Sequence, residues 1–140
     1  MRYLLDTCLI SELIKPRPNA AVVSWLDDRD EHGLFLSVLT LGELQKGISK
    51  LTGSVKKERL HEWVSNDLVE RFDGRILAID REVATAWGIM QGEAERRGDK
   101  LPVMDSLIAA TAQCYNLTVV TRNAKDMERC GVKVYNPWQD

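Results

Sequence analysis

The sequence predicts an α/β fold, in which helices cover both faces of a central, mainly parallel sheet of four to five strands. Short apolar runs alternate with longer amphipathic stretches along the whole chain, which is typical of strand–helix–strand units with right-handed crossovers. The predicted strands are continuous apolar runs with little polar alternation, as expected for strands buried on both faces. The chain has 140 residues, 44% of them hydrophobic, which suffices for one core and not for two. We therefore expect residues 1–140 to form a single domain, a three-layer α/β/α sandwich.

The first half of the chain predicts two strands and three helices. The strands are expected at residues 2–5 and 34–37, and the helices at 7–14, from 20 to the polar stretch 27–30, and from 38 through 48. Asn19 is the expected N-cap of the second helix, after a Lys-Pro-Arg-Pro stretch that ends the first. That second helix is expected to bury Val22, Val23 and Leu26 and to hold Trp25 at its edge.

The second half of the chain continues the same alternation. Helices are expected over 55–72, 81–97 and 102–115, strands at 75–79 and 117–120, and an edge strand at 132–135. Gly74 and Gly98 end two of these helices, since glycine readily adopts the left-handed conformation that follows a helix. Asp80 is the expected N-cap of the helix that begins at Arg81. Only a short connection is expected between the last two strands.

The composition excludes several classes of protein. No apolar run approaches the ~20 residues of a membrane span, and Asp6 interrupts what would have to be the apolar stretch of a signal peptide. Cys8, Cys114 and Cys130 form no C-x-x-C pair, so we expect neither a disulfide framework nor a zinc knuckle, and a cytoplasmic location suits them. The 19 basic and 21 acidic residues give a formal net charge of −2. This balance argues against a protein that coats nucleic acid indiscriminately.

Polar residues follow or flank several of the predicted strands. These residues are Asp6 after the first strand, Glu43 one turn into the helix after the second, Asp105 at the start of the helix before the fourth, and Asn123 and Asp126 after the fourth. Because ligand sites of parallel sheets lie beyond the carboxyl ends of the strands, we expect the five side chains to converge there.

Each side chain taken singly has a structural explanation. Asp6 fits an N-cap, Asp105 the positive end of a helix dipole, and Asp126 a turn cap. The stretch from Thr40 to Glu43 matches the S/T-x-x-E capping box. Helix capping is common, so these alternatives stay open for each residue.

A convergent set would need a compensating charge. Two carboxylates ~4 Å apart repel by about 4 kcal/mol at an effective dielectric of about 20, so three pairs would cost on the order of 12 kcal/mol. Such a set is either partly protonated or holds a divalent cation, and oxygen donors without His or Cys suit Mg²⁺ or Mn²⁺. Acid-bound ions of this kind activate water, so we expect hydrolysis of a phosphodiester. The hydroxyls of Thr7 and Thr121 are near enough in sequence to orient the acids or a water.

Four ordered blocks of the sequence resemble the PIN-domain ribonucleases, in particular the VapC-type toxins of bacterial toxin–antitoxin modules. The blocks are Leu4–Thr7 with Ile10-Ser11, Leu36–Leu44 with Gly47, Asp105–Ala112, and Val120–Asn123. The closing Asn136-Pro137-Trp138 looks like the FitB-like branch of these toxins. The resemblance spans essentially the full length and implies a single PIN-like domain over residues 1–140.

The resemblance implies an endoribonuclease dependent on Mg²⁺ or Mn²⁺, with Asp6, Glu43 and Asp105 as catalytic and metal-binding residues. The FitB-like branch often has an aspartate where this chain has Asn123, whereas other members carry the acid where it has Asp126. We hypothesise that Asp126 completes the catalytic and metal-binding set. Asn123, like Thr7 and Thr121, would then support it. Cys8 stands where the family usually has asparagine, so the support of Asp6 is expected to differ.

The substrate and the partners follow partly from charge and partly from the resemblance. Arg122 adjoins the acids, and its guanidinium suits phosphate oxygens, so it is the expected RNA-binding residue. The resemblance implies structured RNA such as tRNA as substrate, a homodimer, and a VapB-like DNA-binding antitoxin. Leu9, Leu13, Trp25 and Leu26 are candidates for an antitoxin groove, although most of this set is expected to belong to the core.

One alternative function stays open. A PIN scaffold that has lost activity and only binds a partner protein is consistent with Cys8 and Asn123, the two departures from the family pattern. Other phosphate chemistry fits less well, because an aspartyl-phosphate phosphatase would need a second acid at the position of Cys8. Metal titration together with RNA cleavage separates an enzyme from an inactive scaffold.

Overall fold

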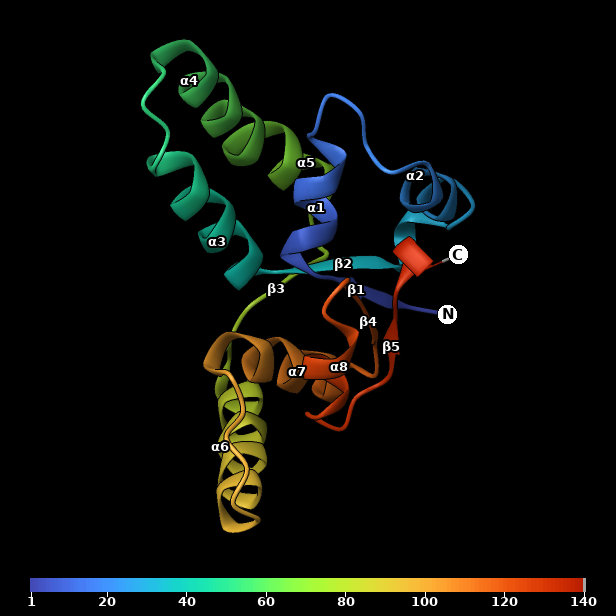
Figure 1. The fold of residues 1–140 in the computed structure, drawn as a ribbon, viewed down its shortest axis with the longest axis vertical. Helices are drawn as coiled ribbons and strands as arrows, with labels where there is room; N and C mark the ends of the chain where they lie inside the picture. The colour runs from blue at the N-terminus through green and yellow to red at the C-terminus, as the bar shows by residue number, and fades with distance from the viewer. Residues whose placement is uncertain (140) are drawn as a thin grey trace.

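A computed structural model, which describes residues 1–139, shows helices packed on both faces of a parallel sheet (Figure 1). The strand order is β3-β2-β1-β4-β5, and every neighbouring pair is parallel. The strands are β1 Tyr3–Leu5, β2 Leu34–Ser37, β3 Ile76–Leu77, β4 Thr118–Val120 and β5 Val134–Tyr135. The predicted α/β/α architecture and its parallel sheet are confirmed.

The helices divide between the two faces of the sheet. They are α1 Thr7–Leu13, α2 Ala20–Asp27, α3 Val38–Ser49, α4 Ser54–Glu62, α5 Val69–Arg71, α6 Arg81–Arg96, α7 Val103–Tyr115 and α8 Ala124–Glu128. Figure 1 shows α1, α3, α4 and α5 on one side of the sheet, and α6, α7 and α8 on the other. Short 3-10 turns lie at Glu31–Gly33 and Pro137–Gln139.

Two hydrophobic cores fill the spaces between these layers. In β1, Tyr3 and Leu5 pack into the core beneath α1, α2 and α3, whereas Leu4 between them packs into the core beneath α7. Successive residues of a strand point to opposite faces of the sheet, so the three apolar residues of β1 contribute side chains to both cores. Leu4 and Leu5 are almost fully buried, at 0% and 1% exposure. The continuous apolar character of the strands is thereby explained.

Several predicted helix ends are confirmed by their caps. The Asn19 side chain accepts hydrogen bonds from the backbone N–H groups of Ala21 and Val22, and the Asp80 side chain accepts one from Val83. Gly74 and Gly98 have φ angles of +79° and +77°, the left-handed conformation expected after a helix. Local sequence therefore determined where these helices begin and end.

Other local predictions are wrong in detail. Trp25 lies in the core at 8% exposure rather than at the edge of α2, because it packs edge-on against Tyr3 and stacks on Tyr135. Thr40 and Glu43 do not form a capping box, since Ser37 is the N-cap of α3 and accepts a hydrogen bond from the N–H of Leu39.

Three segments depart from their predicted bounds. The helix expected over 55–72 contains a π-helical turn at Trp63–Leu68 between α4 and α5. The strand expected over 75–79 is reduced to Ile76–Leu77 at the sheet edge, where it pairs only with β2. The connection after β4 contains the short helix α8.

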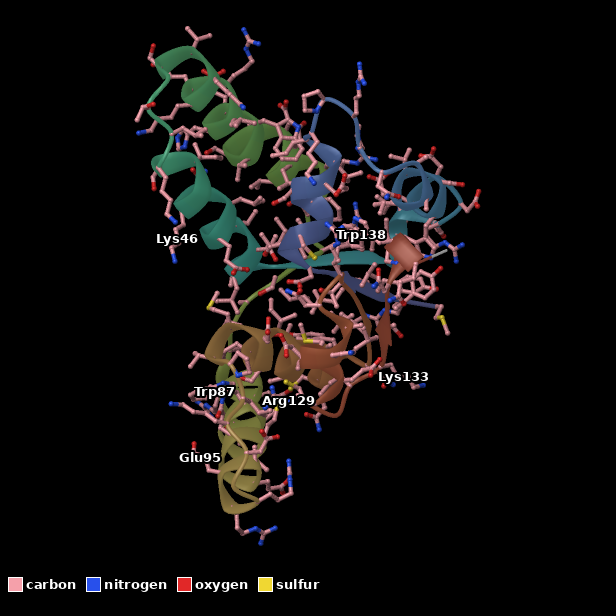
Figure 2. All side chains as sticks on the ribbon, viewed as in Figure 1. Lys46, Trp87, Glu95, Arg129, Lys133 and Trp138 are labelled. Carbon is pink, nitrogen blue, oxygen red and sulfur yellow. The ribbon has the colours of Figure 1, made fainter. Side chains whose placement is uncertain are left out.

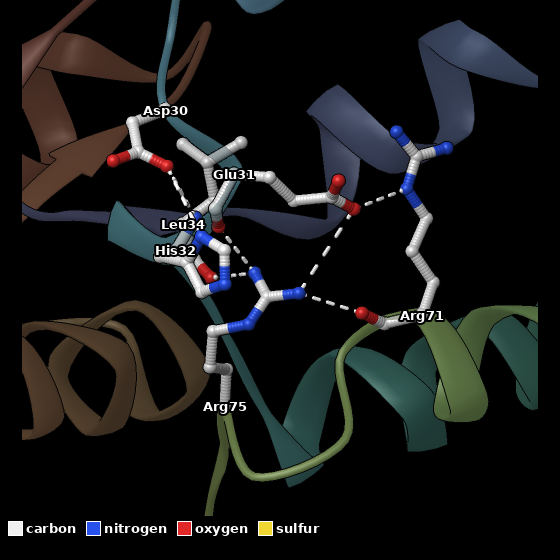
Figure 3. Close-up of polar contacts among 6 residues, drawn as sticks. All are labelled: Asp30, Glu31, His32, Leu34, Arg71 and Arg75. Carbon is white, nitrogen blue, oxygen red and sulfur yellow. Dashed lines mark hydrogen bonds and ion pairs between the residues drawn. The ribbon is translucent and has the colours of Figure 1, made fainter.

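An arginine ties the end of α5 to the start of β2, as Figure 3 shows. The Arg75 guanidinium donates hydrogen bonds to the carbonyl oxygens of Glu31, Leu34 and Arg71 at 2.5, 2.7 and 2.6 Å. It also lies 4.8 Å from the centroid of the Phe72 ring. We call these five residues the Arg75 network. They connect segments about 40 residues apart next to the β2–β3 pair.

No helix among residues 1–139 combines the length and the apolar character that crossing a membrane requires.

Candidate active site

A cavity of about 410 Å³ lies beyond the carboxyl ends of β1 and β4, bounded by α1, α3 and α7. Its lining includes three of the predicted acids, Asp6, Glu43 and Asp105. Arg122 and Asn123 line it from the segment after β4. We call this cavity the acid cleft. Residues from four separate chain segments meet there because parallel strands all end at the same edge of the sheet.

Both carboxylate oxygens of Asp6 accept hydrogen bonds. It follows β1 directly, and only 7% of the residue is exposed. Its Oδ1 accepts a hydrogen bond from the N–H of Thr7 at 2.9 Å, and its Oδ2 accepts one from the Thr121 hydroxyl at 2.8 Å. Asp6 therefore caps α1 and is also oriented by the strand next to its own, so the capping explanation and the site explanation coexist.

Glu43 is joined to α1 by a short hydrogen bond. The Thr7 hydroxyl donates to Glu43 Oε1 at 2.5 Å and lies 3.1 Å from the hydroxyl oxygen of Thr40. Since Thr7 also binds Asp6 through its backbone N–H, one residue orients two acids. Thr7 and Thr121 thus each donate a hydroxyl hydrogen bond to one of the predicted acids.

The carboxyl of Asp105 is surrounded by the charges of other acids. Asp105 lies in the first turn of α7, and burial together with the negative charges of Asp6, Asp126 and Glu43 raises the pKa of its carboxyl above the usual range. Among residues 1–139, no lysine or arginine lies within ion-pair distance of Asp6, Glu43 or Asp105. The cleft therefore carries negative charge that the described side chains do not neutralise.

The donor set fits a divalent ion held at an open site. In the part of the chain that the structure describes, no group of three or more His, Cys, Asp or Glu side chains forms a preformed metal-binding site. Mg²⁺ is usually bound by only one or two carboxylates and keeps several waters. Asp6, Glu43 and Asp105 line one cavity without a paired cation, so one or two of them together with waters could hold such an ion.

The two candidates for the fourth position lie differently. Asn123 lines the acid cleft, and its backbone N–H donates to the Thr121 hydroxyl at 3.0 Å. Asp126, in α8, is not part of the lining, and its Oδ1 lies 3.7 Å from Nη1 of Arg129. The charge of Asp126 still contributes to the raised pKa of Asp105.

Cys8 links the loop after β4 to α1. Its Sγ accepts a hydrogen bond from the N–H of Arg122 at 3.4 Å and lies 3.5 Å from the hydroxyl oxygen of Thr121. Burial and the Asp6 carboxylate raise the pKa of the Cys8 thiol, so the sulfur adds no charge to the cleft. Cys8 is thus a contact between two walls of the cleft rather than only an apolar filler.

Sequence reasoning missed several residues of the lining, above all Glu12 and Trp138. A signal for Glu12 was present, because Cys8, Ser11, Glu12 and Lys15 follow the i, i+3, i+4, i+7 spacing of one helical face. The backbone N–H of Asn19 and the Lys15 ammonium hold the pKa of Glu12 below its usual range. No local signal points to Trp138, which comes from the far end of the chain.

A second cavity, of about 560 Å³, lies between α1, α2 and residues 63–72. Leu13 and Leu26, two of the groove candidates, line it. The other two groove candidates, Leu9 and Trp25, are core residues at 0% and 8% exposure, as the alternative explanation expected.

Comparison with known proteins places this geometry in a family context. Residues 3–132 match the family model described as "PIN domain". The chain is 39% identical to Toxin FitB of Neisseria gonorrhoeae, over 98% of this chain and 99% of that one. It is 31% identical to the tRNA(fMet)-specific endonuclease VapC of Shigella flexneri, over 94% and 93% of the two chains. The crystal structure of FitAcB from Neisseria gonorrhoeae superposes with a TM-score of 0.93 at 38% identity, covering 99% of both chains.

Proposed function

The chain belongs to the PIN-domain family, and we propose that it is a metal-dependent endoribonuclease toxin of the VapBC type. The observation that carries this proposal is the acid cleft, where three acids from separate elements share one cavity without a paired cation. The proposal treats residues 1–140 as one functional domain. The names of the FitB and VapC relatives support the class of activity.

In this proposal each residue of the acid cleft has a distinct task. Asp6, Glu43 and Asp105 would hold Mg²⁺ or Mn²⁺, which supplies charge neutralisation and a water of lowered pKa when it is bound. Thr7 and Thr121 keep two of these carboxylates in fixed orientations through their hydroxyls. The positive guanidinium of Arg122 at the cleft binds a phosphate of the RNA.

We propose Asp126 as the fourth acid and Asn123 as its support. The contribution of Asp126 to the raised pKa of Asp105 favours this arrangement. Asp126→Ala is then expected to weaken metal-dependent cleavage more than Asn123→Ala does. The reverse order would assign the fourth position to Asn123, whose side chain lines the cleft.

The proposed partners are structured RNA such as tRNA, a VapB-like DNA-binding antitoxin and a second copy of the chain. Support comes from the tRNA-specific VapC relative and from the likeness to the FitAcB structure. The groove between α1 and α2 is apolar where Leu13 and Leu26 line it, which suits an antitoxin segment. A cytoplasmic location is proposed because the three cysteines are free.

The test measures cleavage of purified bulk tRNA by the purified chain with Mg²⁺, with Mn²⁺ and with EDTA. Cleavage is expected only with a divalent ion and is expected to disappear in Asp6→Asn and Asp105→Asn. Cleavage that persists in both variants would indicate a contaminating ribonuclease. If the wild-type chain neither binds the ion nor cleaves RNA, the inactive-scaffold alternative replaces this proposal.

A further inference from the structure

The C-terminal turn Pro137–Gln139 returns to the acid cleft and contributes one aromatic side chain to it. Trp138, labelled in Figure 2, lies beside α1 and lines the cleft although it is 126 residues from Glu12 in sequence. The indole Nε1–H of Trp138 donates to Glu12 Oε1 at 3.2 Å. Its backbone N–H donates to the Asn136 side chain at 2.9 Å, so the turn that carries the ring is also held by a hydrogen bond.

Glu12 is a firm anchor for this ring. It is 5% exposed. Besides the hydrogen bond from the indole, its carboxylate accepts one from the N–H of Asn19 at 3.0 Å and forms an ion pair with the Lys15 ammonium at 3.0 Å. Its buried carboxylate is thus satisfied by three donors, which is the condition for a carboxylate to remain charged and ordered at such a position. The ion pair also occupies Lys15, the other cation that lines the cleft.

The guanidinium of Arg122 lies over the ring of Trp138. The guanidinium carbon of Arg122 lies 5.5 Å from the centroid of the indole, within the range of a cation–π contact. Four arginines stack on aromatic rings among residues 1–139, and three of them also donate guanidinium hydrogen bonds to backbone carbonyls: Arg2, Arg29 and Arg75. Arg122 makes no such bond in the described part of the chain, so its donors remain available to a ligand.

We infer that Trp138, anchored by Glu12, is a positioning residue for RNA binding, because its ring holds the free guanidinium of Arg122 at the acid cleft. A long side chain that is already ordered loses less entropy when it binds a phosphate. Stacking fixes the plane of the guanidinium while its N–H edges remain open, and those edges bind phosphate oxygens. This inference rests on the proposed function, in which Arg122 binds RNA.

A double-mutant cycle tests the inference. Binding of fluorescein-labelled bulk tRNA is measured by anisotropy with Ca²⁺ in place of Mg²⁺, so that no turnover is needed. Arg122→Gln and Trp138→Leu are each expected to weaken binding about threefold to tenfold, as loss of a phosphate contact or a cation–π contact would. Because Trp138 acts through Arg122, the double variant is expected to bind no more weakly than Arg122→Gln. Effects that multiply instead would overturn the inference.

Further variants separate positioning from folding. Trp138→Phe keeps a ring face and is expected to bind tRNA more tightly than Trp138→Leu does. Arg122→Lys alters a side chain that makes no guanidinium hydrogen bond, so the fold is expected to tolerate the substitution. Lysine keeps the positive charge but cannot stack a planar group on the indole ring. Arg122→Lys is expected to bind more weakly than wild type even if Trp138→Leu does not fold. Binding by Arg122→Lys equal to that of wild type would refute the role of the stack.

Two controls complete the experiment. Arg2→Gln removes an arginine that stacks 4.9 Å from the Phe35 ring outside the cleft, and it is expected to bind tRNA as the wild type does. In cleavage with Mg²⁺, Trp138→Leu is expected to raise KM and leave kcat within about twofold, since it removes ground-state binding. A wild-type chain that neither binds nor cleaves tRNA refutes the proposed function and this inference together. An additive cycle in an active enzyme refutes only the inference.

Discussion

The acid cleft and the Arg75 network differ in whether their charged side chains have partners. In the network, the Arg75 guanidinium donates to three carbonyl oxygens and lies 3.9 Å from the Glu31 carboxylate. In the cleft, Asp6, Glu43 and Asp105 have no ion-pair partner among residues 1–139, and neither has Arg122. Balanced charge is typical of a group that stabilises the fold, and unbalanced charge is typical of a site prepared for a ligand. The same residue type, arginine, therefore has a structural role in one region, and the role we propose for it in the other is to bind a ligand.

Removing charge from the cleft is expected to have the largest effect on activity and little effect on the fold. Asp105→Asn is expected to lower tRNA cleavage at least about 100-fold, because a metal ligand loses its charge. The same variant is expected to be as stable as wild type or more so, since it relieves repulsion from Asp6 and Glu43. Cleavage assays and thermal melting in EDTA check both parts. A variant that retains activity but melts early would contradict the comparison.

Removing charge from the Arg75 network is expected to have a large effect on the stability of the fold and little effect on activity. Arg75→Gln leaves carbonyl oxygens of Glu31, Leu34 and Arg71 without their donor, so unfolding free energy should fall by about 2–3 kcal/mol. Arg122→Gln is the matched control, and its unfolding free energy is expected to stay within about 0.5 kcal/mol of wild type. Urea denaturation measures both. Equal destabilisation by the two substitutions would mean that the regions do not differ as described.

A divalent ion is expected to stabilise the chain through the cleft alone. Mg²⁺ at about ten times its dissociation constant should raise the unfolding free energy by about 1.4 kcal/mol. The gain should vanish in Asp6→Asn and persist in Arg75→Gln, because only the first variant changes the carboxylates. Melting curves with Mg²⁺ and with EDTA provide the measurement. Stabilisation of Asp6→Asn equal to that of wild type would place the ion elsewhere.

The smallest effect is expected from the hydroxyl that orients Asp6. Thr121→Val keeps the size of the side chain but removes the donor 2.8 Å from Asp6 Oδ2. Cleavage is expected to fall about tenfold, as is common when a group that orients a metal ligand is lost. Thr118→Val, at the start of β4, changes a threonine whose hydroxyl donates to none of the acids among the described residues, so it is the control and is expected to cleave normally. Comparable losses in both variants would point to a general effect on the strand.

Local chemistry in the sequence predicted much of the secondary structure. Asn19 and Asp80 cap the helices expected of them, because a cap depends on a side chain and on backbone groups two or three residues away. The prediction failed where distant contacts decide. The burial of Trp25 depends on Tyr3 and Tyr135. The capping prediction failed for a local reason, since α3 begins at Val38 and its N-cap is Ser37 rather than Thr40.

The sequence by itself determined that several of the predicted side chains gather at the edge of the sheet. Asp6, Arg122 and Asn123 follow strands closely, and parallel strands all end at one edge, so chain order was enough to bring them to the cleft. Only the tertiary structure decided that Trp138 joins Glu12 and Arg122, and that Arg75 is enclosed by carbonyl groups. These contacts join residues that are up to 126 positions apart. No periodicity encodes them, because they depend on how the layers pack against one another.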